Sequence, residues 1–101
     1  MNRTYDRNRF DDGDVLDEIS DVLEQIDPDI GYGDWIQVLM AIFNLTRNSA
    51  AGFELADAWS SGGQKYKGTK DVRRAWRYFK LDHPRAVGMR RLREIAARIP
   101  N

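Results

Sequence analysis

The fold of this chain is decided by residues 35–43, which read Trp-Ile-Gln-Val-Leu-Met-Ala-Ile-Phe. Trp35, Val38, Leu39 and Ile42 repeat the i, i+3, i+4, i+7 spacing of one helical face. Only Gln37 interrupts the apolar surface, and a helix that is apolar nearly all round must be covered on several sides. The stretch is too short for a membrane span, which needs about 20 apolar residues. We therefore expect the central helix of a small bundle.

Four more helices are expected around this one, because apolar residues keep a helical period in each. The first, third and fourth of the five expected helices cover about 14–25, 50–60 and 70–80. The second begins at 33 or 34 and ends near 46, and the fifth begins between 84 and 88 and ends near 99. Asp34, Ser49 and Thr69 are candidate N-caps, and Asn48 is a candidate left-handed residue at a helix end. No run alternates with period two for long enough to predict a strand. The fold class is therefore all-α, with a flexible polar arm over 1–12 and one compact helical bundle domain over 13–101.

Large aromatic side chains are expected to provide much of the stability. The chain has 101 residues, of which 42% are hydrophobic and 11% aromatic, so its core is modest. Trp35, Trp59 and Trp76 each lie on the apolar stripe of an expected helix. We expect all three in one core cluster.

The formal net charge of zero hides a division along the chain. Residues 1–60 hold thirteen acidic and four basic residues, and residues 61–101 hold three acidic and twelve basic residues. Two interpretations are open: mutual compensation inside the bundle, or one surface suited to phosphate and another suited to a basic partner.

The best functional feature is a basic stripe on the fourth expected helix and the loop before it. Tyr66 lies in that loop between two lysines, where it could stack on a base or fold back onto the core. The candidate nucleic-acid-binding residues are Lys65, Tyr66, Lys67, Lys70, Arg73, Arg74, Arg77, Arg90 and Arg91. The candidate surface for a protein partner, which is the alternative, is the first helix with Asp14, Asp17, Glu18, Asp21 and Glu24.

Catalytic and metal motifs are weak. His83 is the only histidine and the chain has no cysteine, so we predict no metal site and no thiolate chemistry. Ser60-Ser61 lacks an accompanying base, and Gly62-Gly63-Gln64-Lys65 lacks the full phosphate-loop spacing. We expect no enzyme and no cofactor. The first residues contain no apolar signal region, so a cytoplasmic protein without a membrane partner is expected.

A set of motifs in fixed order resembles a known family. The set is Asp34-Trp35, Met40-Ala41, Gly52 to Leu55, Trp59-Ser60-Ser61, Lys65-Tyr66, Arg74-Ala75-Trp76 and Phe79. It resembles the primase C-terminal type 2 domain, a helical module found beside primase or helicase domains in phage and plasmid replication proteins. The resemblance covers about residues 15–96. The chain departs from the family pattern at Lys67-Gly68, where an aspartate is usual, and at 87–90, where a Thr-Gly-Thr-Leu-like run is usual.

The resemblance implies a non-enzymatic accessory module of phage or plasmid replication. Its partners would be DNA, single-stranded or template-primer, or primase or helicase domains. The alternative is a freestanding phage interaction protein of the anti-CRISPR kind, which would use the acidic first helix to block a host nucleic-acid-binding complex. The sequence has no primase catalytic carboxylates and no phosphate loop, so the resemblance implies the fold more directly than the role.

Overall fold

The computed structural model describes residues 3–80 and 87–98, with side chains described from residue 13 onward. These residues form the helices α1 (Arg3–Leu23), α2 (Tyr32–Leu45), α3 (Ala50–Ser60), α4 (Thr69–Trp76) and α5 (Met89–Arg98). The described part of the chain contains no strand. The prediction of a single all-α domain with five helices is confirmed.

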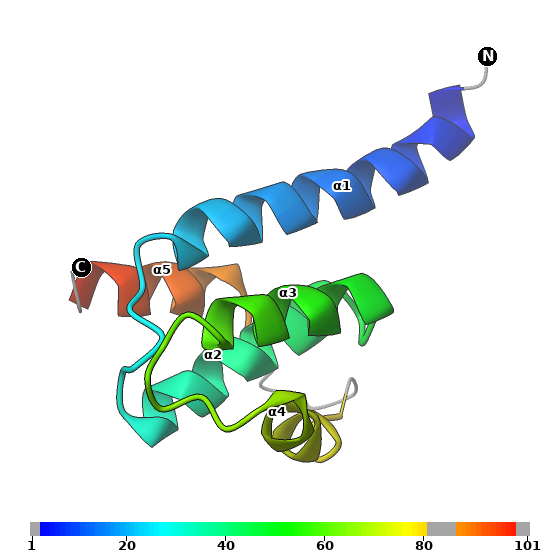
Figure 1. Cartoon of the computed structure of the whole chain (residues 1–101). Helices are drawn as coiled ribbons and strands as arrows, with labels where there is room; N and C mark the ends of the chain where they lie inside the picture. Colours follow the sequence, from blue (N-terminus) through cyan, green and yellow to red (C-terminus); the bar gives the residue numbers. More distant parts are fainter. Residues whose placement is uncertain (1–2, 81–86, 99–101) are drawn as a thin grey trace.

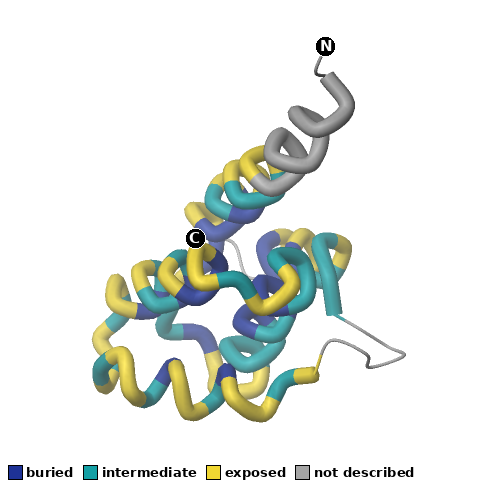
Figure 2. Tube along the Cα trace, turned by 90° about the vertical axis from the view of Figure 1, so that its right-hand side faces the viewer, coloured by how far each residue is buried: buried dark blue, intermediate teal, exposed yellow. Residues whose placement is uncertain are grey.

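The centre of the bundle is α2, as the apolar stretch 35–43 predicts. It packs against α3, α4 and α5, while α1 lies across α3 and α5 (Figure 1). Val38, Leu39, Ala41 and Ile42 are completely buried on α2. Figure 2 shows buried residues on the inward sides of the helices and exposed residues on their outer sides. Removal of this apolar surface from water is the main favourable term in folding.

The turn between α2 and α3 follows from its sequence. Asn48 has a φ of 60°, the left-handed conformation that asparagine tolerates, and its backbone N–H donates to the Phe43 carbonyl oxygen at 2.8 Å. The Ser49 hydroxyl oxygen then accepts the backbone N–H of Gly52 at 2.9 Å. Both predictions for this turn, the left-handed Asn48 and the Ser49 cap, are confirmed.

Several predicted boundaries are wrong. α1 begins at Arg3 instead of Asp14, because the segment before Asp14 has no proline and one glycine costs a helix only about 1 kcal/mol. α2 begins at Tyr32, so Asp34 lies in its first turn instead of capping it. Gly68, with a φ of 108°, precedes α4, and Thr69 is the first helical residue.

The last predicted boundaries fall near residues that the structure leaves undescribed. α4 ends at Trp76 and not near Lys80. The turn expected at residues 82–84, which contains His83, lies outside the described residues. The mobility expected of residues 1–12 stays a prediction.

The three tryptophans are not equally buried. Trp76 is buried, with 6% of its surface exposed, whereas Trp35 and Trp59 are half-buried at the edge of the core. The prediction that all three are core residues is therefore correct in full only for Trp76. Trp35 lies in the first turn of α2, before the fully buried part of that helix, which begins at Val38.

Candidate functional site

Two loops that are distant in the sequence meet at one carboxylate. Asp29, in the loop between α1 and α2, accepts the backbone N–H groups of Gln64 and Lys65, each at 2.8 Å. Gly63 has no room for a side chain here, because a Cβ would overlap the Asp29 carboxylate. The loop between α3 and α4 is thereby fixed against the loop between α1 and α2.

The electrostatics of this junction favour an ionised Asp29. The backbone N–H of Gln64, then that of Lys65, and the Lys65 ammonium hold the pKa of the Asp29 carboxyl below its ordinary value. The junction is therefore fixed at neutral pH, and it weakens when the carboxyl takes up a proton.

The junction forms one side of a hollow of about 430 Å³, here called the aromatic hollow. Its lining includes Tyr32 and Trp35 from α2, and Lys65, Tyr66 and Lys67 from the loop between α3 and α4. The Tyr32 and Trp35 ring centroids are 5.7 Å apart, and Tyr32 is 72% exposed. A large aromatic side chain exposed in a concave surface is typical of a binding site.

Hydrogen bonds hold two rings of the aromatic hollow, those of Trp35 and Tyr66. The Trp35 indole N–H donates to the Ser60 hydroxyl oxygen at 3.0 Å, and Ser60 is buried. The Tyr66 hydroxyl donates to Asp57 Oδ1 at 2.8 Å, and Thr69 donates to the other oxygen of Asp57 at 2.8 Å. Tyr66 therefore packs on the core, as one of its two expected roles required, and still lines the hollow.

A basic surface leads away from the hollow along α4. Asp71 lines the hollow and pairs with Arg74 at 3.0 Å. The guanidinium of Arg73 lies over the Phe53 ring, 4.1 Å from its centroid. The α4 basic surface consists of the exposed residues Lys65, Lys67, Lys70, Arg73, Arg74 and Arg77. The opposite side of α4 buries Val72 and Trp76, so the two faces of this helix are separate.

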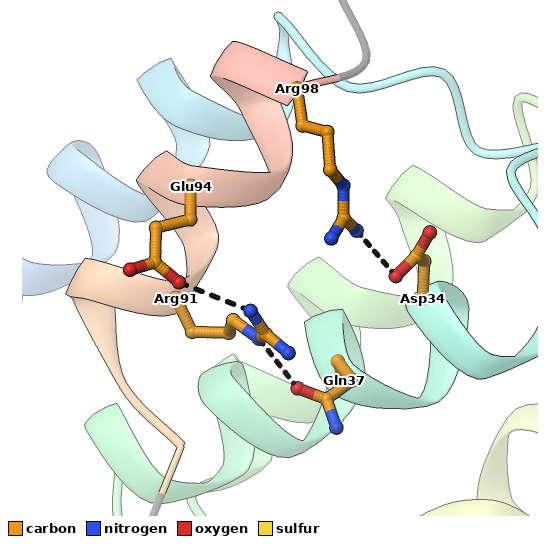
Figure 3. A network of polar contacts seen from close by, with 5 residues as sticks. All are labelled: Asp34, Gln37, Arg91, Glu94 and Arg98. Atoms are coloured by element: carbon orange, nitrogen blue, oxygen red, sulfur yellow. Dashed lines mark hydrogen bonds and ion pairs between the residues drawn. The ribbon is translucent and has the colours of Figure 1, made fainter.

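The other expected basic residues lie elsewhere. α5 packs on α1 and α2, whereas α4 packs on α3 and α2, so the two helices lie on different sides of α2 (Figure 1). Arg91 donates to Gln37 Oε1 at 2.8 Å and pairs with Glu94 at 3.1 Å, and Arg98 pairs with Asp34 at 2.6 Å (Figure 3). Arg90 is exposed. The structure thus brings together the expected residues of α4 and its preceding loop, and separates Arg90 and Arg91 from them.

From residue 13 onward, where side chains are described, the acidic residues of α1 are exposed to solvent. The exposed members of the candidate set are Asp14, Asp17, Glu18, Asp21 and Glu24. Glu18 forms an ion pair with Arg93 of α5. Compensation within the bundle therefore occurs at Glu18.

The described residues contain no group of three or more metal-ligating side chains. Among the described helices, none is both long enough and apolar enough to cross a membrane.

Comparison with known families identifies the family of this chain. The model of the family Primase C terminal 2 (PriCT-2) matches residues 19–96. The chain belongs to the PriCT-2 family. The PriCT-2 match spans α2, α3 and α4 completely and thus includes the aromatic hollow and the α4 basic surface. No significant match to a curated protein or to a solved structure was found.

Three residues of this candidate site are not among the binding residues that the sequence predicted. The sequence predicts Trp35 as a core residue and assigns no role to Tyr32 or Asp29. A signal is present for Tyr32, because it precedes Trp35 by three residues and the two share a helical face. No sequence pattern indicates that Asp29 binds a loop 35 residues away.

Proposed function

We propose that this PriCT-2 domain is a non-enzymatic accessory module of replication that binds nucleic acid through the α4 basic surface. The PriCT-2 family is associated with primases, and this association is the reason for proposing a role in replication. The observation that supports it best is the continuity of exposed cations from Lys65 and Lys67 onto α4. Primase or helicase domains are further proposed partners.

The cations of this surface are available to a ligand at low cost. The Arg74–Asp71 pair is solvent-exposed, and such pairs contribute only about 0–1 kcal/mol to stability. Arginine can bind a phosphate with two parallel N–H donors, which suits Arg73, Arg74 and Arg77 to a nucleic-acid backbone. Each neutralised phosphate releases condensed counterions, so binding should weaken steeply as salt rises.

Charge reversal tests the proposal. Replacing Arg73, Arg74 and Arg77 together with Glu should abolish oligonucleotide binding measured by fluorescence anisotropy, while circular dichroism reports a folded helical domain. Affinity that does not change in the triple variant would refute the α4 basic surface as the binding site.

A matched pair of single variants locates the surface. Lys70 and Arg90 are both exposed and both the second residue of a helix, so Glu at either position meets the same favourable helix dipole. We expect Lys70→Glu to weaken binding and to reduce its salt dependence by about one phosphate contact, and Arg90→Glu to leave both unchanged. If Arg90→Glu weakened binding more than Lys70→Glu did, the binding surface would lie on α5 and not on α4.

The second candidate function is that of an interaction protein that binds a basic host complex through α1. The solvent exposure of Asp17 and Asp21 favours it, since complementary charge speeds association. Asp17→Lys with Asp21→Lys should then slow association at low salt and leave the melting temperature unchanged. A lowered melting temperature would instead indicate that these acids serve pairing inside the bundle.

A further inference from the structure

We propose that the aromatic hollow receives one unstacked base of a single-stranded nucleic acid, and that the site therefore prefers single strands to duplex. This inference rests on the proposed function and specifies its ligand. It adds Tyr32 and Trp35, two aromatic residues that the charge pattern does not point to, to the binding surface.

The size and lining of the hollow suit a flat ring. Its volume of about 430 Å³ lies in the range of small-ligand sites, roughly 300–1,000 Å³. Three aromatic rings, those of Tyr32, Trp35 and Tyr66, contribute to its walls. Aromatic side chains bind bases by stacking, which is tolerant of sequence because every base has a π-face.

Two of the three rings of the hollow are held in place by contacts within the domain. Trp35 is held by the buried Ser60 hydroxyl, and Tyr66 by Asp57. The loop that carries Tyr66 is held in turn by Asp29 through the backbone N–H groups of Gln64 and Lys65. Side chains that are already fixed lose little entropy on binding, so a base gains more from contact with them.

Tyr32 is the wall residue that folding least explains. Its side chain is 72% exposed although it lines the hollow, and its ring centroid lies 5.7 Å from that of Trp35. Leaving such a ring in water costs the folded state part of the apolar burial it could have gained. Stacking on a ligand would recover that burial.

The charges around the hollow select an anionic ligand. Lys65 and Lys67 are exposed at its margin, where phosphates on either side of an inserted base would lie. Of the carboxylates at this place, Asp29 accepts two backbone N–H groups. Asp71 pairs with one nitrogen of the Arg74 guanidinium, and the other N–H donors of Arg74 can still bind a phosphate. The strand can continue from the hollow onto α4, because Arg74 contacts the wall residue Asp71.

The same features select single strands over duplex. In a duplex the bases are stacked and paired, and their edges are reached only from the grooves. The hollow is a concave wall of rings, whereas a groove is read by an element that protrudes into it. An unpaired base is free to leave its stack and insert, which is how aromatic platforms recognise single strands.

The test compares two exposed tyrosines. Tyr32 lines the hollow. Tyr78, which is 80% exposed, follows the end of α4 by two residues and does not line the hollow. Anisotropy is measured with labelled oligothymidylate and with a duplex of equal length. Tyr32→Ala should weaken oligothymidylate binding by about 5- to 150-fold, the range for loss of one stacked base, and should leave duplex binding unchanged. Tyr78→Ala should change neither by more than about 2-fold.

A second variant checks the ordered wall. Tyr66→Phe keeps the ring and removes its hydrogen bond to Asp57, so it should weaken oligothymidylate binding less than Tyr32→Ala does. Circular dichroism confirms that each variant is folded.

The outcomes separate the two proposals. If Tyr32→Ala changes single-strand affinity no more than Tyr78→Ala does, or lowers single-strand and duplex affinity equally, the base site is overturned. If the base site is overturned but the charge reversal of Arg73, Arg74 and Arg77 still abolishes binding, the proposed function is supported without the base site. If the parent domain binds neither oligonucleotide, both proposals fail.

Discussion

Two aromatic groups of this domain look alike in the sequence and differ in the structure. The first, the Trp76 cluster, consists of Trp76, Phe43, Phe53 and Phe79. The Trp76 ring centroid lies 5.3 Å from that of Phe43 and 5.4 Å from that of Phe53, in edge-to-face geometry. The second is the ring set of the aromatic hollow, in which Trp35 is half-buried and Tyr32 is 72% exposed.

The difference arises from where each ring lies along its helix. Trp76 lies at the end of α4 that packs on α2 and α3, and its indole N–H donates to Asn48 of the turn between them at 2.8 Å. Trp35 lies in the first turn of α2, next to two loops. Helical spacing indicates which face of its helix a residue occupies. Which part of that face is buried depends on where the other helices pack. The Trp76 cluster therefore serves stability, and the ring set of the hollow remains accessible to a ligand.

The largest expected effect is that of Trp76→Ala on stability. Truncation of a buried large aromatic leaves a cavity, and we expect a loss of about 3–5 kcal/mol in the free energy of unfolding by urea denaturation. Tyr32→Ala should change that free energy by no more than about 0.5 kcal/mol, because the side chain is exposed. Similar losses of stability for the two variants would contradict the distinction between a stabilising Trp76 cluster and an accessible ring set in the hollow.

The next largest effect is expected at Gly52, which precedes Phe53 of the Trp76 cluster. Gly52, the residue before Phe53, is buried, and a Cβ there would overlap the Thr46 hydroxyl, which is fixed by its bond to the Ile42 carbonyl at 2.7 Å. Gly52→Ala should therefore destabilise the domain by about 1–3 kcal/mol in urea denaturation.

Gly33 provides the control, because it lies in α2 and a Cβ added to it would meet no atom within 4 Å. Gly33→Ala should be neutral or stabilising by up to about 1 kcal/mol. A neutral Gly52→Ala would mean that α3 can move away from Thr46 at no cost.

The smallest expected effect concerns the loop that carries Tyr66. The pKa of Asp29 is lowered in the folded state, so its ionised form stabilises the fold at pH values above its unfolded pKa, about 3.9. This stabilisation is lost as the pH falls through the folded pKa. Asp29→Asn should therefore have a lower melting temperature than the parent at neutral pH, and the gap should narrow below about pH 4. A gap that is constant between about pH 3 and pH 7 would contradict this role of the Asp29 charge.

The sequence predicted the fold well and the site only in part. The apolar run of α2, the Ser49 cap and the left-handed Asn48 are local signals, and the structure has all three. The hollow depends on contacts between residues about 35 positions apart, such as Asp29 with Lys65, which no local spacing encodes. The expected joining of Arg90 and Arg91 to the α4 basic surface depended on helix packing, and α5 packs on a different side of α2.

The most direct test follows the indole N–H signals of the tryptophans by nitrogen-15 NMR while oligothymidylate is added. Each donates to a different acceptor: Trp35 to Ser60, Trp59 to Ile26 and Trp76 to Asn48. We predict that the Trp35 signal shifts progressively to saturation and that the Trp76 signal stays in place. A shift of Trp76 without a shift of Trp35, or saturation of binding with neither signal moved, would contradict the assignment of the aromatic hollow as the binding site.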